Sequence, residues 1–231
     1  MKNLHELATR LDSLSASDGL ALVADLFPEK VTFSSSLGQE DQVITALIAT
    51  QSLPIQVFSL DTGRLFPETL ELLARTEGRY RLKIQLYYPS TDSVESLVAK
   101  NGINGFYESV ENRKSCCYVR KVEPLKRALA GKYVWITGLR AEQSANRTEM
   151  KRVEWDEANQ IIKYNPLLDW TYKQLLDYIQ KEKIPYNPLH DKGFISIGCA
   201  PCTRAVLPGE DARAGRWWWE ESKKECGLHS R

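Results

Sequence analysis

Five cysteines lie in three separated parts of the chain: adjacent Cys116 and Cys117, a Cys-x-x-Cys formed by Cys199 and Cys202, and a single Cys226 near the C-terminus. Four thiolates from two distant segments can hold a zinc ion or an iron–sulfur cluster. The remaining thiol lies in a polar, charged segment and is a candidate nucleophile. The pattern therefore predicts a four-cysteine metal centre and a separate catalytic cysteine.

The residue types alone leave the metal open. Ligand number by itself favours structural zinc. Adjacent Cys116 and Cys117 favour a cluster instead, because their side chains would point about 100° apart on a helix. Neighbouring thiolates can bind different iron atoms of one cluster. Lys121 follows Cys117 by one helical turn, so it is either a cation that offsets the charge of the centre or an ordinary surface lysine.

Alternating strands and helices must position these residues. Strands are predicted over residues 31–33, 55–60, 83–88 and 133–137, and helices within the first 27 residues and over 43–49, 67–80 and 116–129. This order predicts an α/β fold, with a parallel twisted sheet and helices on both faces. We expect one domain over residues 1–207 and a mobile tail over 208–231 that carries Cys226.

Composition limits the classes of partner. The 231 residues are 42% hydrophobic, and 31 Lys and Arg are balanced by 30 Asp and Glu. This balance predicts no nucleic-acid partner, and the lack of a long apolar run predicts no membrane span. A cytoplasmic location is expected, where cysteines serve as ligands or catalytic thiols rather than disulfides. A homo-oligomer is compatible with the sequence.

Polar loops follow three of the predicted strands, and ligands of parallel sheets bind at the carboxyl ends of strands. We therefore expect these loops to converge on one crevice. Residues 34–41, with the sequence SSSLGQED, combine small side chains, hydroxyls and a following helix, which suits an anion. The same residue types also cap helices without binding a ligand. The loop lacks the Gly-Lys-Ser/Thr ending of a Walker A motif.

Four segments together resemble the adenylyl-sulfate reductases of the PAPS/APS reductase family: residues 34–41, LDTGRLFPET at 60–69, TGLRAEQS at 137–144 and KECGLH at 224–229. The resemblance implies an adenine nucleotide α-hydrolase-like (PP-loop) fold. It also implies reduction of adenosine 5′-phosphosulfate (APS) to sulfite and AMP in assimilatory sulfate reduction, with thioredoxin or a similar dithiol protein as reductant. Retention of all four paired cysteines implies a [4Fe-4S] cluster bound by Cys116, Cys117, Cys199 and Cys202.

The resemblance also implies roles for single residues. Cys226 would attack the sulfate sulfur and become an S-sulfocysteine, with His229 and Lys121 assisting. Arginines suit the two anionic groups of APS. The substrate-binding set implied by the family positions is Ser36, Thr62, Gly63, Gly138, Arg140, Arg147, Arg213 and Arg216.

Three alternatives remain. One is a PAPS reductase, which uses the 3′-phosphorylated nucleotide. Another is an ATP-using PP-loop tRNA sulfurtransferase, although the SGGKDS type of loop is absent. A non-enzymatic alternative is a nucleotide-binding regulatory module with a four-cysteine zinc site, in which Cys226 would be dispensable.

Overall fold

The computed structural model describes residues 2–143 and 150–220 of the chain. The chain divides into two compact units, and each is described by itself. The first unit contains the described parts of Met1–Ser59, Glu68–Gln85 and Gly131–Asn187. The second contains the described parts of Leu60–Pro67, Leu86–Ala130 and Pro188–Arg231.

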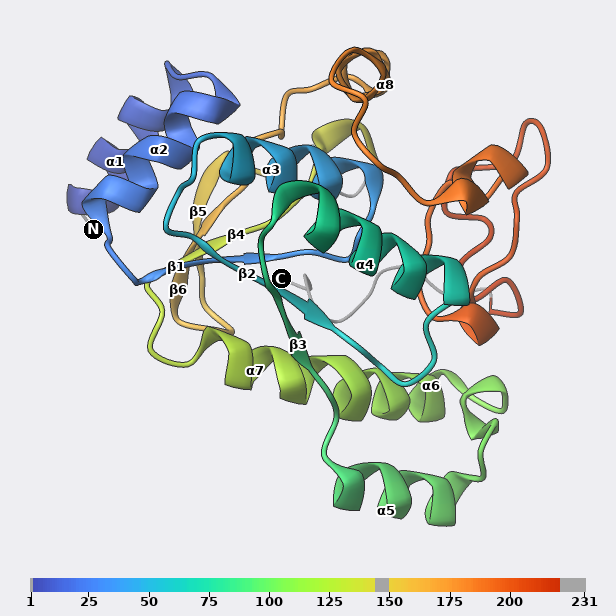
Figure 1. Ribbon diagram of the computed structural model, residues 1–231. Coiled ribbons are helices and arrows are strands. Elements are labelled where there is room, and N and C mark those ends of the chain that lie inside the picture. The colour runs from blue at the N-terminus through green and yellow to red at the C-terminus, as the bar shows by residue number, and fades with distance from the viewer. Residues whose placement is uncertain (1, 144–149, 221–231) are drawn as a thin grey trace. The chain divides into compact units, whose positions relative to one another are not determined.

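A six-stranded sheet has the strand order β3-β2-β1-β4-β6-β5 (Figure 1). Parallel pairing joins β1 to β2 and to β4, and joins β4 to β6, whereas β5 pairs with β6 in the antiparallel direction. The strands are β1 (Val31–Ser34), β2 (Gln56–Leu60), β3 (Ile84–Tyr87), β4 (Val134–Ile136), β5 (Val153–Asp156) and β6 (Ile161–Tyr164). The predicted α/β fold with a largely parallel sheet is confirmed, with one antiparallel edge strand.

Helices of the first unit bury their apolar faces in its core. They are α1 (Lys2–Asp12), α2 (Ala16–Leu26), α3 (Gln39–Thr50), α4 (Pro67–Tyr80) and α8 (Tyr172–Lys181). Ser15 caps α2 by accepting a hydrogen bond from the backbone of Asp18, and a capping box begins α8. Phe33, Ile44 and Ile136 are fully buried between these elements. Burial on both faces explains why β4 is apolar throughout and why the first three residues of β1 are all buried.

The sequence patterns missed four elements. Strands β5 and β6 contain charged residues, and Lys163 of β6 is buried against Glu154 of β5, with 3.4 Å between Nζ and Oε1. This pairing hides the alternation expected of a strand. Helix α8 and, in the second unit, α5 (Thr91–Asn101) were also not predicted. No residue of α5 is fully buried, so its sequence carries a weak apolar stripe.

A long helical segment dominates the second unit (Figure 1). Helix α6 (Val110–Cys117) passes through a π-helical turn, η2 (Tyr118–Val122), into α7 (Glu123–Leu129). The predicted helix over residues 116–129 therefore begins earlier, after the Ser109 cap. The wide turn ends two residues before Pro124, which has no N–H for an i→i−4 hydrogen bond.

Short 3₁₀ turns complete the chain: η1 (Gly105–Tyr107), η3 (Ala141–Gln143), η5 (Pro188–Lys192) and η6 (Ala200–Cys202). The small core of the second unit consists of Phe106, Cys199, Cys202 and Trp217. Two of the predicted metal ligands are therefore core residues.

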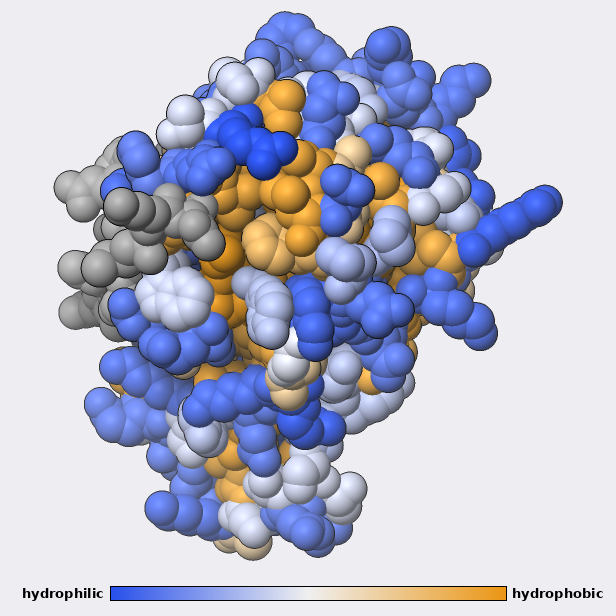
Figure 2. Space-filling view, turned by 90° about the vertical axis from the view of Figure 1, so that its left-hand side faces the viewer, coloured by the Kyte–Doolittle hydropathy of each residue, from blue (hydrophilic) through white to orange (hydrophobic). Residues whose placement is uncertain are grey.

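Some apolar side chains remain exposed. Leu26 is 39% exposed and Trp155 is 42% exposed. On the face shown in Figure 2, hydrophobic residues gather in a central band between hydrophilic ones. Within the described part of the chain, no helix combines the length and apolar character needed to cross a membrane.

Candidate metal centre and nucleotide loops

The four paired cysteines line one pocket in the second unit, with about 370 Å³ of atom-free space that is partly open to solvent. Cys116 and Cys117 end α6, and Cys199 and Cys202 lie at the start and end of the η6 turn. The backbone N–H of Ala200 donates to the carbonyl of Arg64 over 2.8 Å, which ties this turn to the loop after β2. Two segments distant in sequence are thus held together around the four sulfur atoms.

Positive charge surrounds these thiols. Arg64, Arg113, Arg120 and Lys121 line the pocket, and no carboxylate is found among its described lining residues. Burial raises the pKa of Cys202 to about 12, repulsion from Cys199 adds to the effect, and Lys121 opposes it. Thiolates at this depth therefore require a compensating charge, which bound metal and the basic side chains can provide.

The donor chemistry fits a metal centre. Four cysteines are the ligand set of a [4Fe-4S] cluster and also of structural zinc. None of the four forms a disulfide within the described residues. Their spacing is not that of a compact site, because no three His, Cys, Asp or Glu side chains in the described ranges are arranged to hold a metal ion. The pocket assembles the ligand types without fixing the metal.

The loop after β2 meets the cysteine pocket through Thr62. The hydroxyl of this buried residue lies 3.3 Å from Cys199 Sγ, and its carbonyl accepts a 2.7 Å hydrogen bond from Arg120 Nη1. Gly63 has a φ of 69°, in the left-handed region that glycine adopts without a Cβ penalty. Thr62, which is predicted to contact substrate, therefore also contacts Cys199 in the cysteine pocket.

Arg120 was given no role by the sequence reasoning. The residue is 8% exposed, and Nε is buried with no hydrogen-bond partner among the described residues. The π-helical turn carries both Arg120 and Lys121 into the lining of the pocket. Arg120 follows Cys116 by four residues, the same helical spacing by which Lys121 follows Cys117, so the signal was available for both residues.

The described part of the predicted tail, residues 208–220, is tied to the cysteine segment. Arg216 forms a β-bridge with Thr203, and the N–H of Trp217 donates to the Cys202 carbonyl over 3.2 Å. The Arg216 guanidinium is buried 4.7 Å from the centre of the Trp217 ring. Arg213 is half-buried on the preceding turn.

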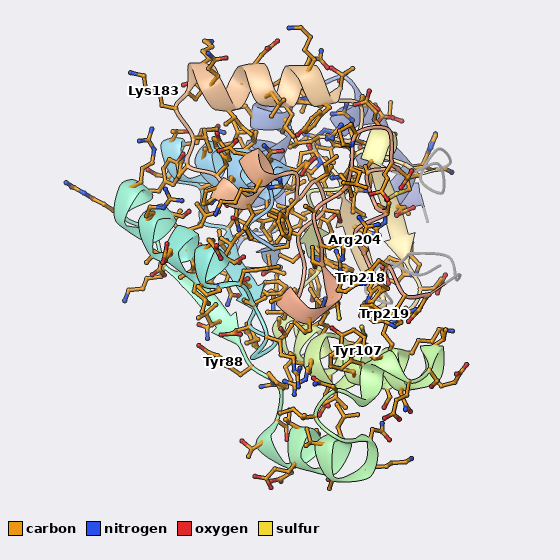
Figure 3. All side chains as sticks on the ribbon, turned by 90° about the vertical axis from the view of Figure 1, so that its right-hand side faces the viewer. Tyr88, Tyr107, Lys183, Arg204, Trp218 and Trp219 are labelled. Carbon is orange, nitrogen blue, oxygen red and sulfur yellow. The ribbon has the colours of Figure 1, made fainter. Side chains whose placement is uncertain are left out.

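Aromatic side chains make a second set of contacts between residues 208–220 and the rest of the second unit. Figure 3 shows Tyr107, Trp218 and Trp219 gathered at one place in the second unit. The ring centroids of Tyr107 and Trp219 are 4.4 Å apart, and those of Trp218 and Trp219 are 4.9 Å apart. The Tyr107 hydroxyl donates to the Pro201 carbonyl over 2.7 Å. Packing within the unit is thus one role of these rings.

The anion-loop candidate lies in the first unit, between β1 and α3. Asp41, in the first turn of α3, accepts hydrogen bonds from both the backbone N–H and the hydroxyl of Ser36, each over 2.6 Å. Burial raises the pKa of the Asp41 carboxyl to about 7, although the bonds from Ser36 act in the opposite direction. The exposed Ser36 is thereby fixed at the loop surface.

Gly138 and Arg140 follow β4 and pack against the same loop. A Cβ on Gly138 would lie 2.0 Å from Asp41 Oδ1, so only glycine fits without a shift. Arg140 is 3% exposed, with Nε 2.8 Å from Glu40 and Nη1 3.0 Å from Glu142. The guanidinium that was predicted to bind an anion is here matched by two carboxylates.

Three predicted site residues, Arg147, Cys226 and His229, lie outside the described residues. The structure brings Lys121, Thr62 and Arg216 to the cysteine region of the second unit. Ser36, Gly138 and Arg140 come together in the first unit.

Residues 30–205 match the family described as the phosphoadenosine phosphosulfate reductase domain. A relative from Allochromatium vinosum, named adenosine 5′-phosphosulfate reductase, is 54% identical over 204 residues, which cover 88% of this chain and 80% of the relative. A relative of the same name from Burkholderia cepacia is 52% identical over 225 residues, covering 97% of this chain and 89% of the relative.

Two solved structures share the fold of this chain. The phosphoadenylyl-sulfate (PAPS) reductase from Candida auris superposes with a TM-score of 0.75 at 28% identity, covering 89% of this chain and 97% of that one. Yeast FAD synthetase shares the fold alone, with a TM-score of 0.53 at 16% identity, and the match covers 87% of this chain and 74% of the synthetase. The family match, the relatives and the fold agree, and the chain belongs to the phosphoadenosine phosphosulfate reductase family.

Proposed function

We propose that this protein reduces APS to sulfite and AMP in assimilatory sulfate reduction, which leads to cysteine biosynthesis. The observation that carries the proposal is the pocket in which four cysteines meet four basic side chains. Relatives more than 50% identical are named adenosine 5′-phosphosulfate reductase. The name and the cysteine pocket together favour APS over its 3′-phosphorylated analogue as the substrate.

In the proposed first step, the Cys226 thiolate attacks the sulfate sulfur of APS. A sulfur–sulfur bond forms, the bond from sulfur to the phosphate oxygen breaks, and AMP leaves with the bonding electron pair. His229 would stabilise the thiolate of Cys226. An ordinary thiol is only about 3% ionised at pH 7, so full ionisation contributes at most about 2 kcal/mol, less the nucleophilicity lost as pKa falls.

In the second step, a thiolate of thioredoxin or a similar dithiol protein attacks Cys226 Sγ. Sulfite leaves with the electron pair of the broken bond, and the second thiol of the reductant then displaces Cys226. The dithiol loses two electrons and the sulfate sulfur gains two, so no other redox partner is needed. A reducing, cytoplasmic location follows from this requirement for thiols.

The residues of the first unit would bind the nucleotide and its anionic groups. Ser36 offers a hydroxyl on the loop before α3, and Gly138 allows the close approach of two loops. Arg140 and Arg147 would add charge for the phosphosulfate. Binding through Arg140 requires exchange with Glu40 or Glu142, because both carboxylates contact its guanidinium.

In the second unit, Cys116, Cys117, Cys199 and Cys202 would hold a [4Fe-4S] cluster. When bound, the cluster would serve a structural and electrostatic role, because the dithiol supplies both electrons. Lys121, Arg213 and Arg216 would place positive charge for the sulfate, and the Thr62–Gly63 backbone would contact the nucleoside. The charged residues would thereby reduce the repulsion between the thiolate and its anionic target.

Sulfite release is the direct test, using protein purified without oxygen and thioredoxin as reductant. APS and its 3′-phosphorylated analogue are compared, with Cys226→Ser as the control. The proposal expects a preference for APS and no sulfite from Cys226→Ser. Preference for the 3′-phosphorylated nucleotide would make the protein a PAPS reductase, and release from neither by protein with an intact metal centre would refute the proposal.

A further inference from the structure

Arg113 of α6 and Glu220 form a buried ion pair in the second unit. Nε and Nη2 of Arg113 each donate to one carboxylate oxygen of Glu220 over 2.9 Å. The two side chains are only 3% and 4% exposed. The fork of the guanidinium therefore fixes the carboxylate in one orientation, away from competing water.

The same guanidinium contacts the metal-ligand region. Arg113 lines the cysteine pocket together with Cys117. The centre of the Trp217 ring lies 4.6 Å from the guanidinium carbon. Arg113 thus connects the last described residue, Glu220, to a predicted cluster ligand.

The ion pair matters for the chemistry because Glu220 lies only a few residues before Cys226. Five residues separate Glu220 from Cys226 in the sequence, and the six steps between them span at most about 22 Å. The backbone before Glu220 is already tied to the cysteine segment at Thr203 and Cys202. The fixed Glu220 thus sets the region that the catalytic thiol can reach.

Stability alone gives little reason for a pair of this kind. Two buried charges lose hydration, and well-packed apolar side chains often replace such a pair without loss of stability. In some proteins, buried polar pairs are instead retained because they select one geometry among several. A pair that joins α6 to the chain before Cys226 is therefore better explained by placement than by stabilisation.

We propose that Arg113 and Glu220 are positioning residues that fix, beside the cysteine pocket, the point from which the chain extends to Cys226. The inference rests on the proposed function, in which Cys226 is the nucleophile. It assigns the two residues no contact with substrate. Their loss should slow attack on APS while leaving nucleotide affinity and the metal centre in place.

The test uses full-length Glu220→Gln and Arg113→Lys. Glutamine keeps the shape of Glu220 but removes its charge, and lysine keeps the charge of Arg113 but removes the fork. Each protein is mixed with APS without reductant, and the rate at which Cys226 gains a sulfonate group is followed by mass spectrometry. Iron content, the visible absorption of the metal centre and AMP affinity are measured on the same samples.

The matched control is Glu210→Gln. Glu210 forms a bidentate pair with Arg204 over 2.9 Å in the same unit, but the side chains are 35% and 30% exposed. We expect about a 10- to 100-fold loss of sulfonation rate in the two test variants, with iron content and AMP affinity unchanged. The control should match wild type in all measurements.

A sulfonation rate equal to that of wild type in both test variants would overturn the inference. Loss of iron in proportion to the loss of rate would also overturn it, because the pair would then support the metal centre itself. Failure of the proposed function gives a different result, since wild-type Cys226 would gain no sulfonate while the protein was fully loaded with metal.

Discussion

The two units handle charge in opposite ways. In the first unit, polar side chains of the loops after β1 and β4 contact one another, with Arg140 between Glu40 and Glu142 and Asp41 hydrogen-bonded by Ser36. In the second unit, basic side chains line a pocket with four thiols that are buried or half-buried. The first arrangement is complete without a ligand, whereas the second would gain stability from the proposed anionic cluster. On the proposed function, only the second unit would depend on a bound metal for its structure.

The largest effect expected from this difference is loss of the metal centre in Cys202→Ser. A serine hydroxyl is a poor replacement for a thiolate on iron or zinc, and the buried site offers no other described acidic side chain. Iron content and sulfite release should both fall to the detection limit. Cys226→Ser is the matched control, and it should lose activity while keeping its iron. Equal iron in both variants would contradict the division between the two kinds of cysteine.

The second effect concerns pH and the first unit. The pKa of Asp41 is raised from 3.8 to about 7, so the folded protein keeps a proton that the unfolded chain releases. Stability therefore falls as pH rises from about 4 to about 7 and is level above that range. Asp41→Asn removes this dependence and should be the more stable protein at pH 8, by up to about 4 kcal/mol.

Urea unfolding of both proteins at pH 5 and at pH 8 measures this difference. Asparagine can still accept hydrogen bonds from Ser36, so the loop geometry is kept. Parallel pH curves for wild type and Asp41→Asn would show that the carboxyl titrates in its ordinary range.

The third effect is steric and again belongs to the first unit. Gly138→Ala places a methyl group 2.0 Å from Asp41 Oδ1, which should cost about 1–3 kcal/mol of stability and weaken AMP binding. Gly78→Ala is the control, because the Cβ has nothing within 4 Å and α4 continues around it. That change should stabilise by about 1 kcal/mol. Similar AMP affinity in Gly138→Ala and Gly78→Ala would show that Gly138 has no role in AMP binding.

Sequence patterns predicted much of this arrangement, because glycine turns and apolar strands are local signals. The parallel strands β1, β2 and β4 and the loops that follow them were predicted close to their observed bounds. Strands β5 and β6 were missed because Lys163 is buried in an ion pair, which no local pattern reveals. Family resemblance, rather than spacing, predicted the substrate-binding set.

Site residues that depend on tertiary contacts were missed for the same reason. Arg113 lies four residues before Cys117, so helical spacing was an available signal, but its partner Glu220 is 107 residues away. The sequence alone places Asp41 in a polar loop, because the burial that shifts its pKa is a property of the folded chain. It predicts substrate contact for Thr62, whereas the proximity of Thr62 to Cys199 is evident only in the fold.

The smallest expected effect tests whether the Thr62 side chain contacts the cysteine pocket or the substrate. Thr62→Val removes the hydroxyl that lies 3.3 Å from Cys199 Sγ but retains the carbonyl that accepts from Arg120. One lost hydrogen bond is worth about 1 kcal/mol. We expect a shifted absorption spectrum of the metal centre and AMP affinity within about twofold of wild type, or 0.4 kcal/mol. A large loss of AMP affinity with an unchanged spectrum would show instead that the Thr62 side chain contacts the substrate.

The central claim is that the basic cysteine pocket holds an iron–sulfur cluster. Metal and acid-labile sulfide analysis of protein purified without oxygen tests it most directly. The account predicts about four iron and four sulfide per chain, with both lost from Cys202→Ser. One zinc per chain and no sulfide would contradict it and would make the four cysteines a structural zinc site.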